Sequence, residues 1–84
     1  MESTILINGV SLEDWFKYHP PTTQDRIDAH REVNRAAKVM AESVLAHVQD
    51  EKCREMAFFA IQQARMFANQ GITMDYLKNA PKGQ

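Results

Sequence analysis

The chain has 84 residues, a formal net charge of −1 and a single cysteine, Cys53, so it is long enough for one domain and has no intrachain disulfide. The near-neutral charge argues against DNA or RNA as a partner, because such proteins carry strongly basic surfaces. No stretch approaches the ~20 apolar residues of a membrane span, and the N-terminus lacks the features of a signal peptide, so we expect a soluble cytoplasmic protein.

Residues 1–21 predict an arm ahead of the main helices. A short apolar run is interrupted by the Asn-Gly pair at positions 8–9, which is typical of a turn. Ser11, followed three positions later by an acidic residue, predicts a helix N-cap. One or two helical turns should then run through Trp15 and Phe16, whose rings we expect to pack in the core.

The segment Tyr18–Pro21, called the elbow below, ends this short helix. Proline fixes its own φ and disfavours helix in the residue before it. Tyr18 and His19 should therefore lie on a stiff, extended piece of chain. A ring held in this way beside a cationic helix is a plausible surface for a flat, negatively charged ligand.

Residues 22–49 predict the first long helix. Thr22 or Thr23 would cap it, and no glycine or proline follows until its end. Apolar positions recur at steps of three and four, as on one face of an amphipathic helix. The predicted inner face consists of Ile27, His30, Val33, Ala37, Met40, Val44 and Val48.

Residues 51–71 predict a second long helix, with Gly71 as its C-terminal cap and residues 72–84 as a tail. A short connection between long helices implies an antiparallel hairpin. The fold class is therefore all-α, with a short N-terminal helix and a two-helix hairpin in one domain over residues 1–84. The predicted inner stripe of the second helix consists of Cys53, Met56, Ala57, Ala60, Ala64, Phe67 and Ala68.

The apolar surface of the second helix is wider than one partner helix can cover. Phe58 falls on one flank of the predicted stripe, and Phe59 and Met66 fall on the other. The N-terminal arm would cover one flank. We expect self-association to cover the rest, so that the chain forms a homo-oligomer.

Candidate binding residues gather on the first helix. Arg31, Arg35 and Lys38 form a cationic stripe, with Asn34 between it and the apolar face. Arginine can bind phosphate with two hydrogen bonds, and lysine acts as a point charge. The competing interpretation is a solvated face paired with acidic neighbours.

Two interpretations of the elbow also stay open. Tyr18 and His19 can stack on a nucleobase or bond to it. They can equally close the end of the hairpin as part of an aromatic cluster with Trp15 and Phe16.

The residue pattern does not support catalysis or a metal site. The three histidines and Cys53 lack the HxxxH and CxxC spacings of metal ligands. His30 lies on the apolar stripe, as a packed histidine would, and the position of Cys53 also predicts packing. Glu51 and Glu55 form a lone acidic pair without the further carboxylates of a magnesium-dependent nucleotide hydrolase. We therefore expect no enzymatic activity, no cofactor and no metal.

Three motifs in order resemble one known family. Tyr18-His19-Pro20-Pro21 precedes a helix containing Val33-Asn34-Arg35-Ala36-Ala37-Lys38, and the second helix ends in Ala64-Arg65-Met66-Phe67-Ala68-Asn69-Gln70-Gly71-Ile72. Over roughly residues 16–73 the chain resembles the helical-hairpin phage proteins that act as anti-CBASS cyclic-oligonucleotide sponges. Relatives read Tyr-His-x-Pro, then Ile-Arg with a following Ala-Lys, then Met-Trp-Ala-Asn-Ala-Ala-Ile.

The resemblance implies a non-enzymatic homohexamer that acts in the host cell cytoplasm. Such proteins sequester cyclic dinucleotides such as 3′,3′-cGAMP between protomers, and some members hold cyclic trinucleotides at a separate site. It implies that Tyr18 stacks on a base and that His19 and Pro20 shape the pocket wall. The family's Ile-Arg falls at Val33-Asn34, so an amide replaces a cation for which Arg31, Arg35 or Lys38 would compensate.

The resemblance bears on the subunit interface as well. Phe67 replaces the family's tryptophan, a change that concerns packing, and Asn69 would be a polar link to the neighbouring chain. The expected interface residues are Phe58, Phe59, Met66, Phe67 and Asn69. Two other functions stay open: an adaptor hairpin that binds another protein through Phe58, Phe59 and Met66, and an all-helical enzyme that cleaves nucleotides.

Overall fold

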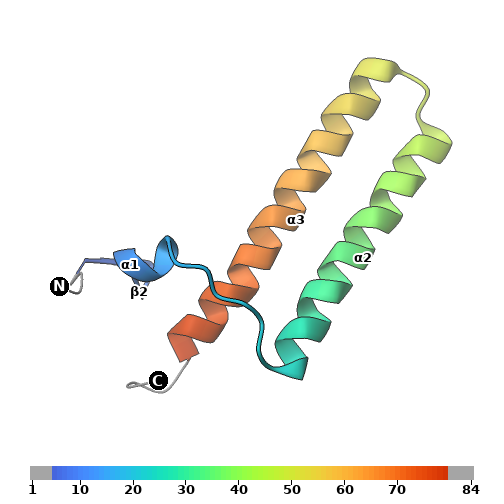
Figure 1. The fold of residues 1–84 in the computed structure, drawn as a ribbon. Helices are drawn as coiled ribbons and strands as arrows, with labels where there is room; N and C mark the ends of the chain where they lie inside the picture. The colour runs from blue at the N-terminus through green and yellow to red at the C-terminus, as the bar shows by residue number, and fades with distance from the viewer. Residues whose placement is uncertain (1–4, 80–84) are drawn as a thin grey trace.

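The computed structural model describes residues 5–79 as a long antiparallel helix pair with a small arm near its open end (Figure 1). The radius of gyration is 16.5 Å, whereas a compact chain of this length would have about 12 Å. The predicted all-α hairpin is confirmed, with a small β-hairpin added to it. In chain order the elements are β1 (Leu6–Ile7), β2 (Val10–Ser11), α1 (Leu12–Trp15), α2 (Gln24–His47) and α3 (Glu51–Asn79).

The predicted turn at Asn8-Gly9 joins β1 to β2. Both residues have positive φ, 52° for Asn8 and 80° for Gly9, as a two-residue hairpin turn of type I′ requires. Leu6 pairs with Ser11 and Ile7 pairs with Val10. The side chain of Val10 is only 3% exposed, and β2 lies against α3, so this hairpin fixes the arm to the long helices.

The short helix α1 begins where Ser11 predicts. The Asp14 N–H donates to Ser11 Oγ at 3.2 Å, and Trp15 Nε1 donates to the Ile7 carbonyl at 3.0 Å. The prediction that Phe16 packs in the core is wrong, because its side chain is 86% exposed. Since successive helical positions point about 100° apart, turning Trp15 toward β1 directs its neighbour Phe16 into solvent.

Helix α2 presents the predicted face to α3. Thr23 is its N-cap, with Oγ1 accepting from the Arg26 N–H at 3.3 Å. All the predicted inner positions are half-buried except Met40, which is 58% exposed. Ala41 lies half-buried in its place.

Helix α3 uses a different face from the predicted one. Of the predicted stripe, only Ala57 is half-buried, whereas Cys53 and its fellow positions are exposed. The residues that face inward lie about a quarter turn away, where Ile61 is 7% exposed. Apolar residues surround most of this helix, so periodicity alone did not identify which face would meet α2. The buried and half-buried positions of this face include Arg54, Ala57, Ile61, Arg65 and Ile72.

The predicted end of the second helix at Gly71 is also wrong, because α3 continues to Asn79. A glycine inside a helix costs about 1 kcal/mol relative to alanine. Burial of Met74, which is 7% exposed, and half-burial of Ile72 and Leu77 offset that cost. Of the predicted tail, residues 72–79 are therefore helical, and residues 80–84 lie outside the described residues.

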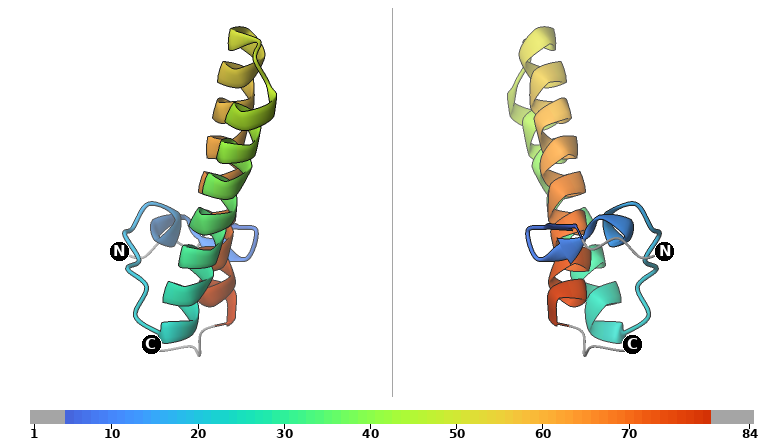
Figure 2. Two further views of the ribbon diagram at one scale, coloured as in Figure 1. Left: turned by 90° about the vertical axis from the view of Figure 1, so that its right-hand side faces the viewer. Right: turned by 90° about the vertical axis from the view of Figure 1, so that its left-hand side faces the viewer.

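Figure 2 shows how the arm covers only part of the helix pair. The β-hairpin projects on one side and the elbow on the other, both near the open end of the long hairpin. The half of α2 and α3 next to their connecting turn has no arm over it. Within residues 5–79, no helix is both long and apolar enough to cross a bilayer.

Two glycine substitutions test this backbone. Gly71→Ala should raise the free energy of unfolding by about 0.5–1 kcal/mol, because the position is helical and an added Cβ meets nothing within 4 Å. Gly9→Ala should lower it, because φ there is +80°. Urea denaturation followed by circular dichroism measures both. A loss of stability on Gly71→Ala would mean that the helix ends at this glycine.

Candidate functional site

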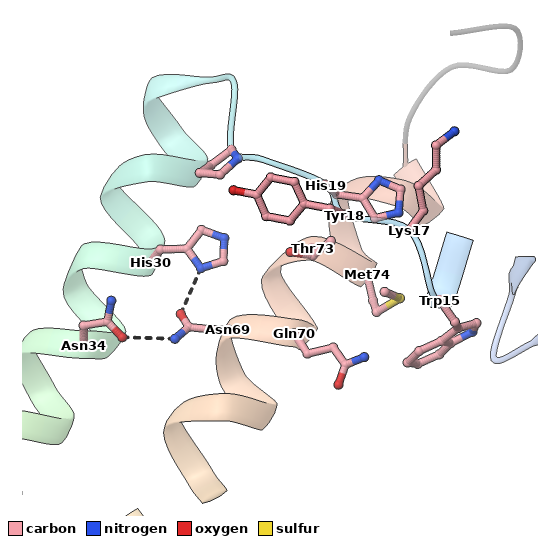
Figure 3. Close-up of a pocket in the computed structure, with 11 residues that line it drawn as sticks. Trp15, Lys17, Tyr18, His19, His30, Asn34, Asn69, Gln70, Thr73 and Met74 are labelled. Atoms are coloured by element: carbon pink, nitrogen blue, oxygen red, sulfur yellow. Dashed lines mark hydrogen bonds between the residues drawn. The ribbon is translucent and has the colours of Figure 1, made fainter. Parts of the chain in front are cut away.

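The elbow and the two long helices enclose an open surface hollow of about 460 Å³ (Figure 3). This volume lies in the range of ~300–1,000 Å³ that small-molecule sites occupy. Both aromatic and amide side chains line it, so it offers both stacking surfaces and hydrogen-bonding groups. The hollow is lined by Trp15, Lys17, Tyr18, His19, Pro21, His30, Asn34, Asn69, Gln70, Thr73 and Met74.

Tyr18 is the most accessible ring of the hollow, with 84% of its surface exposed. Figure 3 shows it on the elbow, across the hollow from Asn34 and Asn69. An aromatic cluster would have buried this ring, so that interpretation does not fit the structure. A ring that contacts no packed core is available to stack on a planar ligand.

His19 is held against the arm. Its Nε2 donates to the Asp14 carbonyl at 2.8 Å, and its side chain is 16% exposed. Because a carbonyl oxygen can only accept a hydrogen bond, Nε2 is the protonated ring nitrogen in this bond. The bond ties the elbow to α1 and gives the wall of the hollow a fixed orientation.

A chain of hydrogen bonds crosses the floor of the hollow between α2 and α3. His30 Nδ1 donates to Asn69 Oδ1 at 2.9 Å, and Asn69 Nδ2 donates to Asn34 Oδ1 at 3.0 Å. Arg65 Nη1 lies 3.5 Å from the same Asn34 oxygen. Asn69, predicted as a link to a neighbouring chain, therefore bonds within its own chain here, and His30 is half-buried on the predicted inner face while also lining the floor of the hollow.

The predicted cationic stripe does not line the hollow. Arg31 Nη1 lies 4.0 Å from Asp28 Oδ1, and both side chains of this pair are mostly exposed. Lys38 also lies outside the hollow. For Arg31 and Arg35, the interpretation as a solvated face with acidic partners fits the geometry. The cationic side chain that does line the hollow is Lys17, next to Tyr18.

Arg35 makes the most specific of these ion pairs. Its Nε donates to Glu32 Oε2 at 2.9 Å, and its Nη2 donates to Glu32 Oε1 at 2.6 Å. The hydrogen bonds and the charge of the guanidinium hold the pKa of the Glu32 carboxyl below its usual value. A phosphate that used Arg35 would have to compete with this carboxylate.

Sequence reasoning missed several lining residues. It placed Pro20 at the wall, whereas Pro21 lines the hollow. Gln70 was not among the predicted site residues although it lies within the predicted helix, and Thr73 and Met74 were missed because that helix was expected to end at Gly71. Thr73 stands four positions after Asn69, and Met74 stands four positions after Gln70, and this spacing is the signal that would have placed these side chains on one helical face.

The chemistry available here is binding by stacking and hydrogen bonding. Within residues 5–79, no three His, Cys, Asp or Glu side chains come together as metal ligands would. The hollow is lined by rings, amides, one hydroxyl, one thioether and one ammonium group. The fold and the site thus define a small helical-hairpin binding domain.

Comparison with known proteins places this domain in a family. Residues 8–73 match the family model described as "Acb2/Tad1, hairpin domain". The chain belongs to this family of anti-CBASS cyclic-oligonucleotide sponges, whose hairpin is a binding domain and not a catalytic one. No curated protein and no solved structure matches the chain.

The Glu32–Arg35 pair is tested by titration. Arg35→Met should raise the pKa of Glu32 toward its usual value, because the hydrogen bonds and the positive charge are removed. Carboxyl ¹³C NMR measures this pKa. Because the folded-state pKa is lowered, the stabilisation from this pair is present above the unfolded-state pKa and is lost as the pH falls through the folded-state value.

The matched control for this titration is Lys38→Met, which removes a cation from the same helix without touching the pair. It should leave the titration of Glu32 unchanged. An unchanged Glu32 pKa in Arg35→Met would instead show that Arg35 is free to bind a ligand.

Proposed function

We propose that this protein is a phage anti-defence protein that sequesters cyclic dinucleotide messengers of bacterial CBASS immunity, of the 3′,3′-cGAMP type, in the host cytoplasm. The ligand is held and not cleaved. The working unit is a homohexamer, and cyclic trinucleotides are a further ligand class for a separate site. Membership in the sponge family supports the general activity.

The observation that carries the proposal is the exposed Tyr18 ring above a floor of amides. A nucleobase needs a flat apolar surface for its face and hydrogen-bonding groups for its edge. Tyr18 offers the first, and Asn34 and Asn69 offer the second. Lys17 beside Tyr18 supplies a positive charge for a phosphate.

A second copy of the chain would complete this site. The hollow is open to solvent, and one chain supplies to it only one strongly exposed ring, Tyr18, and one ammonium group, Lys17. Arg31, Arg35 and Lys38 lie on the outer surface of α2, where they could face the hollow of a neighbouring protomer. A ligand bound between protomers would then contact both groups of residues.

The exposed apolar surface of α3 supports self-association. Met66 is 61% exposed and Phe67 is 72% exposed, and Phe58 and Phe59 are about half-exposed. A lone chain would keep this surface in water, which is unfavourable by roughly 25 cal/mol per Å² of apolar area. These residues are the proposed subunit interface.

Sequestration needs affinity and abundance but no reaction. A sponge is effective when its sites outnumber the messenger and its Kd lies well below the concentration that activates the effector. Stacking and hydrogen bonding can provide this affinity without a catalytic group. The chemistry of the hollow agrees with such a role.

The proposal is tested by calorimetric titration of the protein with a panel of cyclic di- and trinucleotides. We expect heat with at least one cyclic dinucleotide at micromolar protein. Mass spectrometry after long incubation and denaturation should recover the nucleotide intact. The absence of heat with every member of the panel would refute the proposal, and recovery of a linear product would refute sequestration without cleavage.

Tyr18→Ala should weaken cyclic dinucleotide binding by at least about tenfold, since stacking on an aromatic ring contributes ~1–3 kcal/mol per base. The measurement is the same titration, with oligomer size checked by light scattering and expected to stay unchanged. Phe16→Ala is the matched control, because that ring is equally exposed, at 86%, but does not line the hollow. An equal loss of affinity in both variants would show that Tyr18 is not part of the binding site.

An adaptor role is the second candidate function. The same exposed Phe58, Phe59 and Met66 flank would then bind a different protein instead of a second copy. Native mass spectrometry separates the two. A homo-oligomer that retains a cyclic nucleotide supports the sponge, and a monomer that binds no nucleotide favours the adaptor.

A further inference from the structure

Arg26 is the buried charged residue of the described chain, with 7% of its surface exposed. It lies in the first turn of α2, directly after the elbow. Its Nη1 donates to the Pro20 carbonyl at 3.4 Å, and its Nη2 donates to the His19 carbonyl at 3.5 Å. Its Cζ lies 4.0 Å from the centre of the Tyr76 ring on α3.

These contacts join three parts of the chain that local geometry does not join. Proline restricts φ within the elbow but does not fix where the elbow lies relative to the helices. The planar guanidinium can donate to two successive carbonyls at once, and stacking on Tyr76 fixes its plane. Arg26 therefore holds the backbone next to Tyr18 at a set position over α3.

Arg26 is not itself placed to contact a ligand. It is absent from the lining of the hollow that holds Tyr18. The hollow on its other side, of about 430 Å³, is lined by Asp25 and Asp75 as well as Arg26. Two carboxylates disfavour an anion there, so a phosphate site at Arg26 does not fit.

Burial of this charge is costly in itself. The Arg26 Nε is buried without a hydrogen-bond partner among the described residues, and buried charges and unpaired polar atoms are both unfavourable. In this buried position the guanidinium bonds to the two elbow carbonyls and stacks on the Tyr76 ring. These contacts fix the position of the elbow, and we take this to be the role of the buried charge.

We propose that Arg26, stacked on Tyr76, is a positioning residue that holds the elbow so that Tyr18 is presented to the ligand. This inference rests on the proposed function, because it concerns the same site. It also assigns a role to the end of α3 beyond Gly71. The family match ends at residue 73, so Tyr76 lies outside the matched residues.

The experiment has a ligand-free arm and a binding arm. The ligand-free arm measures ¹⁵N order parameters of the Tyr18 and His19 amides. Arg26→Met and Tyr76→Leu should lower them from values near 0.85, typical of rigid backbone, toward the ~0.6 of a flexible segment. In the binding arm, affinity for a cyclic dinucleotide should fall about tenfold if the competent elbow position falls to about a tenth of the population.

Conservative and matched variants separate positioning from general stability. Tyr76→Phe keeps the ring and should keep both the order parameters and the affinity. Arg54→Met removes another partly buried arginine, which donates to the Leu45 carbonyl at 3.4 Å near the far end of the hairpin. It should leave the elbow and the affinity unchanged.

The outcomes are distinct. Unchanged order parameters in both Arg26→Met and Tyr76→Leu would overturn the inference, as would a looser elbow with unchanged affinity. An equal loss of affinity in Arg54→Met would show that stability and not position is responsible. If the wild-type protein binds no cyclic nucleotide, the proposed function fails, and the positioning role fails with it even where the ligand-free arm shows a tethered elbow.

Discussion

Two helices share a single interface, and this constraint governs the rest of the molecule. Each long helix can bury one face against the other, so other apolar residues stay exposed unless another element covers them. The described chain buries only Val10, Ile61 and Met74 among its hydrophobic residues. The elongated shape, with extents of 52 × 27 × 16 Å, is the direct result.

The arm and the extension of α3 complete the open end of this hairpin. Val10 and Met74 are buried there, and Trp15 bonds back to the β-hairpin. Arg26 then ties the elbow to Tyr76 on the extension. The hollow thus lies at the open end of the hairpin, where the arm, α2 and α3 meet. At the end with the connecting turn, no arm covers the two helices.

Hydrogen bonds between side chains hold the groups that line the hollow in place. The hydrogen bonds that link His30, Asn69 and Asn34 occupy some of the donors and acceptors in the floor. They also fix the orientation of the remaining polar groups of these side chains. Tyr18 stays exposed because the elbow turns it away from the core. The domain therefore offers fixed recognition groups, consistent with the binding character of its family.

The amino-acid sequence by itself determined the local structure and the family. The Asn8-Gly9 turn, the caps at Ser11 and Thr23 and the inner face of α2 follow from short-range rules of turn geometry, capping and periodicity, and each was predicted. The sequence also predicted Tyr18 and Asn34, both of which line the hollow, as binding residues. These features depend on residues close to one another along the chain.

Tertiary packing decided what those rules leave open. Apolar residues occur on most sides of α3, so its sequence alone does not identify the inner face. In the fold, Ile61 lies on the face that packs against α2, and Cys53 is exposed. Packing of Ile72, Met74 and Leu77 carried the helix through Gly71, which local propensity would have made its end. The members of the hollow and the contact of Arg26 with Tyr76, fifty positions apart, arise from the same cause: long-range contacts outweigh local preferences of about 1 kcal/mol per residue.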